Sequence, residues 1–425
     1  MSEFVQDYVP GVDYRRDDRS LLTDEGVLDG CVADLLDIAS TAYLADRSSP
    51  RGRVDDASWH RSLRVAVAAR EPAMWKSRPV LDALLSLLAW LSDDEWDLDF
   101  IDGPATEAPA QLRLPLDSAD REVALFSGGL DAVAGAALAL HESRPLIGVG
   151  VCTNPHMRGY QRRTAQALRH VGCGDFVFSS VTLQRRGRVL AEDPTRRTRG
   201  LIFLVCGWAA ARAAGRDELL VFENGVGAIN LPYTMAQSGS MTSRAVHPVT
   251  LRLAADLFSL LSDRPFSVRN PHIADTKGEM CERLPDSARP AVEASESCDS
   301  SAAGRTALHR RCGRCASCLL RRVSLHAAGR AAWDPRPYRA DIDGDDASSA
   351  LPEVLWQAAR LQRCLATEAS QPGAFSREFP AAGEIPADAV SQTRLLAMYC
   401  RHVEEWRRYP HPRVGAFLGN RHLAA

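Results

Sequence analysis

Residues 127–131 read Ser-Gly-Gly-Leu-Asp and join an apolar stretch to a run of small residues that favours a helix. A strand that ends at two glycines and opens a helix presents free backbone N–H groups at the positive helix end, where phosphate oxygens bind. The glycines leave room for those oxygens, Ser127 can donate a hydrogen bond, and Asp131 suits an accompanying Mg²⁺ ion. The lysine of the Walker loop is absent, which disfavours ordinary γ-phosphate transfer. An ordinary strand–turn–helix junction is the alternative interpretation.

Four cysteines form a second group of residues whose spacing is typical of a metal site. Cys298 is followed by Cys312, Cys315 and Cys318, the last three in a C-x2-C-x2-C triplet. Four thiolates from a short segment suit tetrahedral Zn²⁺, and with no open position we expect a metal that stabilises the fold. Disulfide or redox pairing and an iron–sulfur cluster are the alternatives. The other seven cysteines are scattered and no apolar signal segment is evident, so we expect a reducing, cytoplasmic environment.

The segments around the Ser127 loop alternate between strand and helix patterns. Strands are expected near 122–126, 146–151, 176–181 and 218–222, and helices near 130–143, 158–171, 197–214 and 250–262. This alternation predicts an α/β fold with a parallel sheet and helices on both faces. In such folds ligands bind at the carboxyl ends of the strands, where the Ser127 loop would lie.

Five regions are expected along the chain. Residues 1–24 are predicted to be flexible, and 25–110 to form an α+β accessory domain that ends near a linker at 102–109. That domain has a helix pattern at 27–45 capped by Asp24, a strand at 62–69, a helix at 79–91 and a strand at 96–100. A nucleotide-binding core over 121–290, a zinc element over 291–327 and a helical region over 328–425 follow. The last has helices near 353–367 and 390–408.

Polar residues follow the expected strand at 218–222. About twenty-five residues without a predicted element precede the next helix, and connections of that length are usually functional. The candidate substrate-binding residues in this connection are Glu223, Asn224, Gly225, Asn230, Ser243, Arg244 and His247. Arg244 suits a carboxylate and Arg199 suits ATP phosphates. A turn or a solvated surface residue is the alternative for each of them taken singly.

The composition argues against nucleic acids and membranes as general partners. The net charge of −3 gives no electrostatic footprint for general nucleic-acid binding, and no apolar run approaches the ~20 residues of a membrane span. Lys76 and Lys277 are the only lysines among 425 residues, so a lysine inside a motif is informative.

The Ser127 loop resembles that of the PP-loop ATP pyrophosphatases, which cleave ATP between the α- and β-phosphates. With Thr276-Lys277-Gly278-Glu279, the four cysteines and Arg321, the stretch 121–327 resembles the QueC family of 7-cyano-7-deazaguanine synthases. The resemblance implies an ATP and Mg²⁺ site formed by Phe126, Ser127, Gly128, Gly129, Leu130 and Asp131. Asp131, Arg244 and Lys277 are then the catalytic candidates. Ala132 replaces the usual Ser or Thr, and the Cys298–Cys312 loop is longer than usual.

The resemblance implies an enzyme that adenylates 7-carboxy-7-deazaguanine and passes the acyl group to an amine. Residues 43–47, 59–61 and 94–96, with the connection after Glu223, resemble relatives in Qat and type IV CBASS anti-phage operons. For some of these the acceptor is proposed to be a protein amino terminus. We therefore expect a C–N ligase with a protein substrate from its own operon. A nitrile-forming synthase that uses ammonia, a PP-loop tRNA-modifying enzyme and a non-catalytic zinc scaffold are the alternatives. The N-terminal domain would dock a polypeptide or mediate a homodimer.

Overall fold

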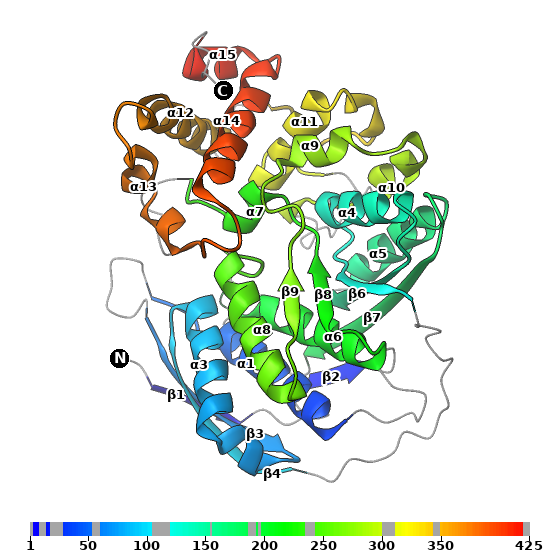
Figure 1. Cartoon of the computed structure of the whole chain (residues 1–425), viewed down its shortest axis with the longest axis vertical. Helices are drawn as coiled ribbons and strands as arrows, with labels where there is room; N and C mark the ends of the chain where they lie inside the picture. The colour runs from blue at the N-terminus through cyan, green and yellow to red at the C-terminus, as the bar shows by residue number, and fades with distance from the viewer. Residues whose placement is uncertain are drawn as a thin grey trace.

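The computed structural model describes residues 3–7, 14–17, 29–52, 60–103, 120–153, 155–185, 193, 197–233, 243–299, 311–342 and 349–419. Figure 1 shows a central sheet with helices around it, the N-terminal region below and the C-terminal helices above. No helix within these ranges has both the length and the apolar character needed to cross a membrane.

The central sheet has six strands in the order β2-β7-β6-β5-β8-β9. They are β2 (Tyr14–Asp17), β5 (Glu122–Leu125), β6 (Leu146–Cys152), β7 (Phe176–Arg185), β8 (Glu218–Val221) and β9 (Ser267–Arg269). All neighbours pair in parallel except β2, which is antiparallel to β7. The parallel strands therefore run 3-2-1-4-5 in chain order, as in doubly wound sheets, and the direction of winding reverses between β5 and β8.

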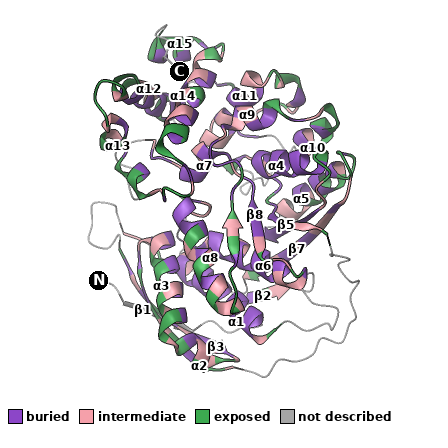
Figure 2. Ribbon diagram, viewed as in Figure 1, coloured by how far each residue is buried: buried purple, intermediate pink, exposed green. Residues whose placement is uncertain are grey.

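Helices cover both faces of this sheet, because residues of β5 alternate between two cores. Ala124 packs in one core with α4 (Leu130–His141) and α5 (Pro155–Leu168). Val123 and Leu125 pack in the other with α6 (Arg199–Ala213) and α8 (Pro248–Ser262). Figure 2 shows α4 buried along almost its whole length. The prediction of a mostly parallel α/β sheet is confirmed.

The N-terminal region has a second sheet, whose three strands are parallel in the order β1-β3-β4. Its elements are β1 (Glu3–Asp7), α1 (Gly30–Ser48), β3 (Ser62–Ala69), α2 (Pro72–Lys76), α3 (Arg78–Ser92) and β4 (Glu95–Asp102). Helix α1 begins after Asp29, whose carboxylate accepts the Cys31 N–H at 2.8 Å. The predicted cap, Asp24, lies outside the described residues. One hydrophobic core joins α1 and α3 to α6 and α8, so this region shares its core with the central sheet.

Two segments of residues 1–24, a range expected to be flexible, lie in strands. Strand β1 pairs with β3, and β2 adds an antiparallel edge to the central sheet through β7. Tyr14, in β2, is 1% exposed and donates a hydrogen bond to Asp37 of α1. Such short strands have weak local patterns because the edge that they join stabilises them.

The remaining helices gather beyond the carboxyl end of the sheet (Figure 1). They are α7 (Gly225–Ile229), α9 (Lys277–Glu282), α10 (Arg289–Ala294), α11 (Ala316–Ala327), α12 (Leu351–Glu368), α13 (Ala374–Glu378), α14 (Gln392–Arg408) and α15 (Pro412–Leu418), with 3-10 turns η3 (Asp286–Ala288), η5 (Ala331–Trp333) and η6 (Pro380–Glu384). Helices α12 and α14 match those predicted at 353–367 and 390–408. They form a core with Ala228, Ile229 and Ile273, which follow β8 and β9.

Candidate functional site

The SGGLD loop (residues 127–131) connects β5 to α4 at the point where the winding of the sheet reverses. Phe126 is buried beneath the loop, whereas the Ser127 side chain is exposed and its hydroxyl accepts the Gly129 N–H at 3.2 Å. Gly128 has a φ of 79°, which favours glycine, and a Cβ there would lie 3.2 Å from Gln161 Cγ. The two glycines thus allow a tight turn that leaves Ser127 open at the amino end of α4.

Charged side chains from three segments meet beside this loop. The Lys277 ammonium lies 2.7 Å from one oxygen of Asp131. The Asn224 amide donates at 2.9 Å to the other Asp131 oxygen and at 2.9 Å to Glu223. We call Asp131, Glu223, Asn224 and Lys277 the site cluster. These residues follow β5, β8 and β9, so the sheet brings together residues about 150 positions apart.

The protonation of the site cluster is perturbed. Burial and the nearby Asp131 carboxylate raise the pKa of Glu223 to about 8. Burial alone would lower the pKa of Lys277, but the Asp131 and Glu223 carboxylates outweigh it and raise that pKa above its usual value. The cluster therefore holds a permanent ammonium beside a carboxyl group that exchanges its proton near neutral pH. Such a pairing suits the transfer of a proton.

Lys277 has a defined position because it begins a capped helix. The Thr276 hydroxyl accepts the Glu279 N–H at 3.1 Å, and the Glu279 carboxylate accepts the Thr276 N–H at 2.8 Å. This is a capping box of the T-x-x-E type, which the sequence displays as Thr276-Lys277-Gly278-Glu279. The lysine that the resemblance singled out is thus fixed at the first turn of α9.

The four predicted metal ligands converge. The sulfur atoms of Cys298, Cys312, Cys315 and Cys318 all lie within 4.8 Å of one another, and those of Cys312 and Cys318 are 3.8 Å apart. Tetrahedral coordination with Zn–S bonds of about 2.3 Å places sulfur atoms about 3.8 Å apart. Backbone N–H groups of Cys312 and Cys315 also point to sulfur atoms at 3.3 Å. The cluster could hold a metal such as zinc, and the eleven cysteines are all free thiols.

The cysteine cluster is joined directly to the SGGLD loop, which the sequence did not suggest. The Glu296 N–H donates to the Gly128 carbonyl at 3.0 Å, and the Leu130 N–H donates to the Ser297 hydroxyl at 3.2 Å. Cys298 is the next residue, and its N–H donates to Glu296 at 2.9 Å. Three consecutive residues, 296–298, therefore connect the cysteine cluster to the loop.

Two predicted residues lie elsewhere, against the N-terminal region. The Arg244 guanidinium contacts Asp93 at 2.7 Å and lies over the Trp90 ring, 4.4 Å from its centroid. His247 caps α8 by accepting the Val249 N–H at 3.2 Å, and its ring is 5.3 Å from that of Trp90. Burial and the Arg244 charge lower the pKa of His247 to about 4. Among the described residues, no hydrogen bond or ion pair joins Arg244 or His247 to the SGGLD loop.

The other predicted site residues have local roles. Asn224 caps α7 by accepting the Gly227 N–H at 2.9 Å, and a Cβ at Gly225 would lie 2.0 Å from the Ile273 carbonyl oxygen. Asn230 ends α7 with a φ of 50°, and its amide donates to the carbonyl of exposed Ser243 at 3.1 Å. Arg199 is the half-buried first residue of α6. Residues 234–242 of the predicted connection lie outside the described ranges.

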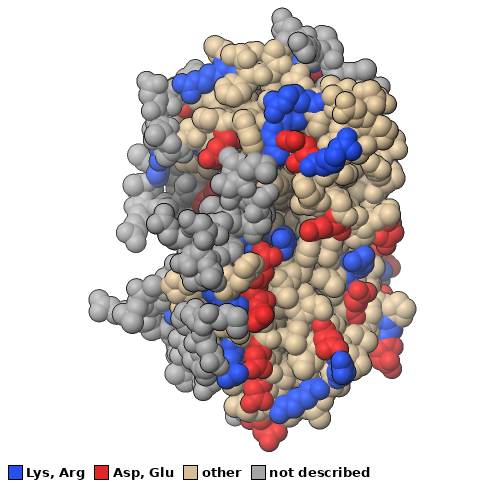
Figure 3. Space-filling model, turned by 90° about the vertical axis from the view of Figure 1, so that its left-hand side faces the viewer, with Lys and Arg blue, Asp and Glu red and all other residues tan. Residues whose placement is uncertain are grey.

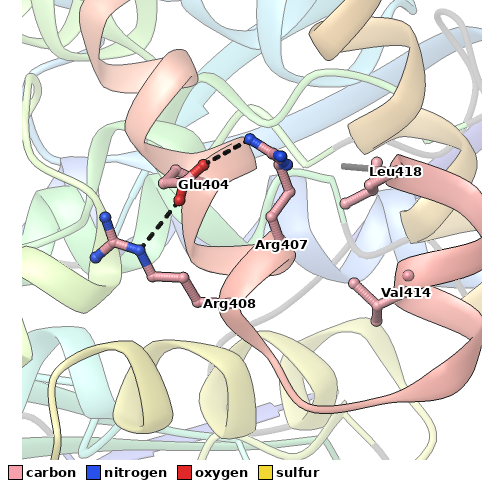
Figure 4. A pocket seen from close by; sticks show the side chains of 7 residues that line it. Glu404, Arg407, Arg408, Val414 and Leu418 are labelled. Atoms are coloured by element: carbon pink, nitrogen blue, oxygen red, sulfur yellow. Dashed lines mark hydrogen bonds and ion pairs between the residues drawn. The ribbon is translucent and has the colours of Figure 1, made fainter. Parts of the chain in front are cut away.

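Two other surfaces offer weaker candidates. A pocket of about 290 Å³ lies between α14 and α15 (Figure 4). Its arginines, Arg407 and Arg408, are already paired with Glu404 at 3.0 and 3.2 Å. On the face in Figure 3, acidic and basic side chains are interspersed over the described surface. Neither surface has the convergent residues found beside the SGGLD loop.

No protein-family model matches the chain, and no curated protein is significantly similar to it. The candidate site therefore rests on its own geometry and on the motifs of the sequence.

Proposed function

We propose that the protein is an ATP-dependent ligase of the QueC type, built on a PP-loop nucleotide-binding core. It would adenylate a 7-carboxy-7-deazaguanine-like carboxylate and pass the acyl group to an amine. The observation that supports this proposal most is the meeting of the SGGLD loop with Lys277 and Asn224 at the switch point between β5 and β8. Ligands of doubly wound sheets bind at this position.

The residues beside the loop suit the nucleotide. The glycines let backbone approach phosphate oxygens, and the exposed Ser127 hydroxyl can donate to them. Asp131 is the carboxylate that could take Mg²⁺, while Lys277 beside it can neutralise charge on a phosphate or carboxylate oxygen. Zinc at the four cysteines would stabilise the segment that holds the loop.

The reaction joins a substrate carboxylate oxygen to the α-phosphorus of ATP and releases pyrophosphate. An amine nitrogen then attacks the activated carbonyl, loses a proton and displaces AMP. Glu223, with a pKa raised to about 8, is suited to exchange that proton. Ammonia as the amine gives an amide on the way to a nitrile, whereas a protein amino terminus gives a stable conjugate. We favour the protein acceptor, because the N-terminal region adds a structured surface that a small-molecule synthase does not need.

The first test is pyrophosphate–ATP exchange with Mg²⁺ and 7-carboxy-7-deazaguanine. We expect exchange that depends on the carboxylate and is lost in Gly128→Val, because the branched side chain strains the loop and crowds Gln161. Gly215→Val is the matched control: Gly215 also has a positive φ, but nothing lies within 4 Å of its Cβ position. Exchange that is absent from the parent, or equal in parent and Gly128→Val, would reject the proposal.

A second test identifies the acceptor. The intact chain is incubated with ATP, 7-carboxy-7-deazaguanine and either ammonia or a candidate operon protein. The masses of the products are then measured by mass spectrometry. We expect a mass increase at the protein amino terminus. Free 7-cyano-7-deazaguanine with an unmodified protein would favour the nitrile synthase. Deleting residues 1–105 is not a clean alternative, because α1 and α3 share their core with α6 and α8.

A further inference from the structure

The C-terminal helix α14 lies directly on the two segments that carry the site cluster. A Cβ at Gly225, the first residue of α7, would lie 2.3 Å from the Met398 sulfur. A Cβ at Gly278, the residue after Lys277, would lie 2.3 Å from a Glu405 carboxylate oxygen. Both contacts are far shorter than real Cβ contacts. The two glycines therefore leave room for the Met398 and Glu405 side chains of α14 in their present positions.

Polar contacts tie α14 to the start of α9. The Thr276 hydroxyl, which caps α9, donates a short hydrogen bond to buried Glu405. Arg401 forms an ion pair with Glu279 at 2.7 Å and donates to the Ala274 carbonyl at 2.9 Å. The capping box that fixes Lys277 is thus itself held by two residues of α14.

A third residue of α14 faces Lys277. His402 is 4% exposed, and burial together with the positive charge of Lys277 lowers the pKa of His402 to about 4. Its Nδ1 atom is 4.0 Å from the Glu405 carboxylate. The imidazole is therefore neutral at pH 7 and adds no repulsion toward the ammonium.

We propose that α14 is a wall of the active site and that Glu405 is a positioning residue, which holds Thr276 and thereby directs Lys277 toward Asp131. The C-terminal helical region then completes the site rather than being an appendage. The catalytic part of this inference rests on the proposed function, since it gives Lys277 a role in adenylation. The positioning part concerns only the side chain of Lys277 and can be measured without any reaction.

The chain offers a direct probe, because Lys76 and Lys277 are its only lysines. The side chain of Lys76 is 56% exposed and that of Lys277 is 12% exposed. A lysine-specific acylating reagent, followed by peptide mass spectrometry, reports each labelling rate in the same sample. We expect Lys277 in the parent to react at least tenfold more slowly than Lys76, which serves as the internal reference.

Glu405→Ala removes the acceptor of the Thr276 hydroxyl and should raise the Lys277 labelling rate at least fivefold. It should also lower kcat at least tenfold, with less than a threefold change in the KM for ATP. Glu405→Gln keeps an oxygen acceptor and should restore both values to within threefold of the parent. Glu404→Ala, on the same helix but paired with Arg407 and Arg408, is the control and should change neither.

A second variant changes the other partner of the contact between Glu405 and the start of α9. Gly278→Ala places a methyl group against Glu405, so it should raise Lys277 labelling in the parent but have a smaller effect in Glu405→Ala. Unchanged Lys277 labelling in both Glu405→Ala and Gly278→Ala would overturn the positioning role. The Lys277 labelling can also respond as expected while the parent shows no carboxylate-dependent pyrophosphate–ATP exchange. That result would support the positioning role of Glu405 and reject the proposed function.

Discussion

Two of the buried charge clusters in the described residues differ in how completely their charges are matched. An interdomain cluster joins the N-terminal region to the central sheet and comprises Asp46, Arg51, Arg61, Asp93, Asp94, Arg197 and Arg244. In it, Arg61 lies 2.6 Å from both Asp46 and Asp94, and the Thr198 N–H and hydroxyl also donate to Asp46. In the site cluster, one ammonium faces two carboxyl groups, one of which has a strongly raised pKa.

The degree of charge matching distinguishes a cluster that stabilises the fold from one suited to chemistry. Guanidinium groups that pair with each buried carboxylate hold an interface in one arrangement. Removing one partner weakens the compensation of a buried charge. Where carboxyl groups outnumber cations, the pKa of one carboxyl group rises, and that group can exchange a proton near neutral pH. We therefore expect the two clusters to differ in role, the first acting on stability and the site cluster on the proposed reaction.

The largest effect is expected from loss of the metal ligands that support the site cluster. Cys315→Ser should lower the free energy of unfolding by at least about 4 kcal/mol, because structural zinc contributes directly to folding. ATP binding should weaken too, since Ser297 and Glu296 connect the cysteines to the loop. Metal analysis and thermal melting check both, with the exposed free thiol in Cys173→Ser as control. Less than half an equivalent of zinc in the parent would contradict the assignment.

Breaking the interdomain cluster comes next. Arg61→Ala should cost about 3–5 kcal/mol, because Asp46 and Asp94 keep Arg51 but lose the buried cation that lies 2.6 Å from each of them. Urea unfolding measures this loss. The control is Arg64→Ala, whose ion pair with Asp97 is more than half exposed and should change stability by less than about 0.5 kcal/mol. Equal effects of the two substitutions would remove the distinction between buried and exposed pairs on which the comparison depends.

Lys277→Ala should act on turnover more than on binding. We expect at least a tenfold lower rate of pyrophosphate–ATP exchange, about 1.4 kcal/mol in the barrier, with a modest change in ATP affinity. Lys76→Ala removes the other lysine, an exposed partner of Asp99, and should leave the rate unchanged. A parental exchange rate in Lys277→Ala would assign this lysine to structure.

Substitution of Arg244 tests whether this residue contributes to stability or to the reaction. The sequence suggests a catalytic role, whereas the structure pairs this residue with Asp93 and Trp90. Arg244→Ala should therefore lower stability by about 1–2 kcal/mol and leave exchange within threefold of the parent. A melting temperature like that of the parent, combined with lost exchange, would return Arg244 to the site.

A further prediction concerns the pH dependence of stability. Glu223 keeps its proton up to about pH 8 when folded, whereas the free side chain loses it near pH 4.5. Between these values the folded state binds more protons than the unfolded state, so the free energy of unfolding falls as pH rises. Glu223→Gln should remove this part of the slope, which urea titrations at pH 5 and pH 8 can detect. Identical slopes in the parent and the variant would show that Glu223 ionises normally.

Much of this architecture could be predicted from local sequence patterns. Strands and helices with clear periodicity, such as 146–151 and 353–367, lie close to their expected bounds, and cysteine spacing predicted the four residues that converge in a cluster able to hold a metal. Strands β1, β2 and β9 were missed because short strands depend on the partners that they pair with.

Within the site, sequence reasoning identified residue types better than their partners. The sequence points to both Asp131 and Lys277, and the sheet brings them together. The sequence also points to Arg244 and His247, yet tertiary packing places both of them against Trp90. Glu405 carried no signal, because its importance comes only from the contact with Thr276, 129 residues away. The charges are visible in a sequence, whereas their pairing is a property of the fold.

The most direct test of the contrast is the fate of α-phosphate-labelled ATP in a single turnover with Mg²⁺ and 7-carboxy-7-deazaguanine. The parent and Lys277→Ala are compared with Arg244→Ala, so that each cluster is represented. We expect labelled AMP from the parent and from Arg244→Ala, and at least tenfold less from Lys277→Ala. Labelled ADP, no nucleotide product, or equal AMP from the parent and Lys277→Ala would contradict the assignment of the site cluster to adenylation.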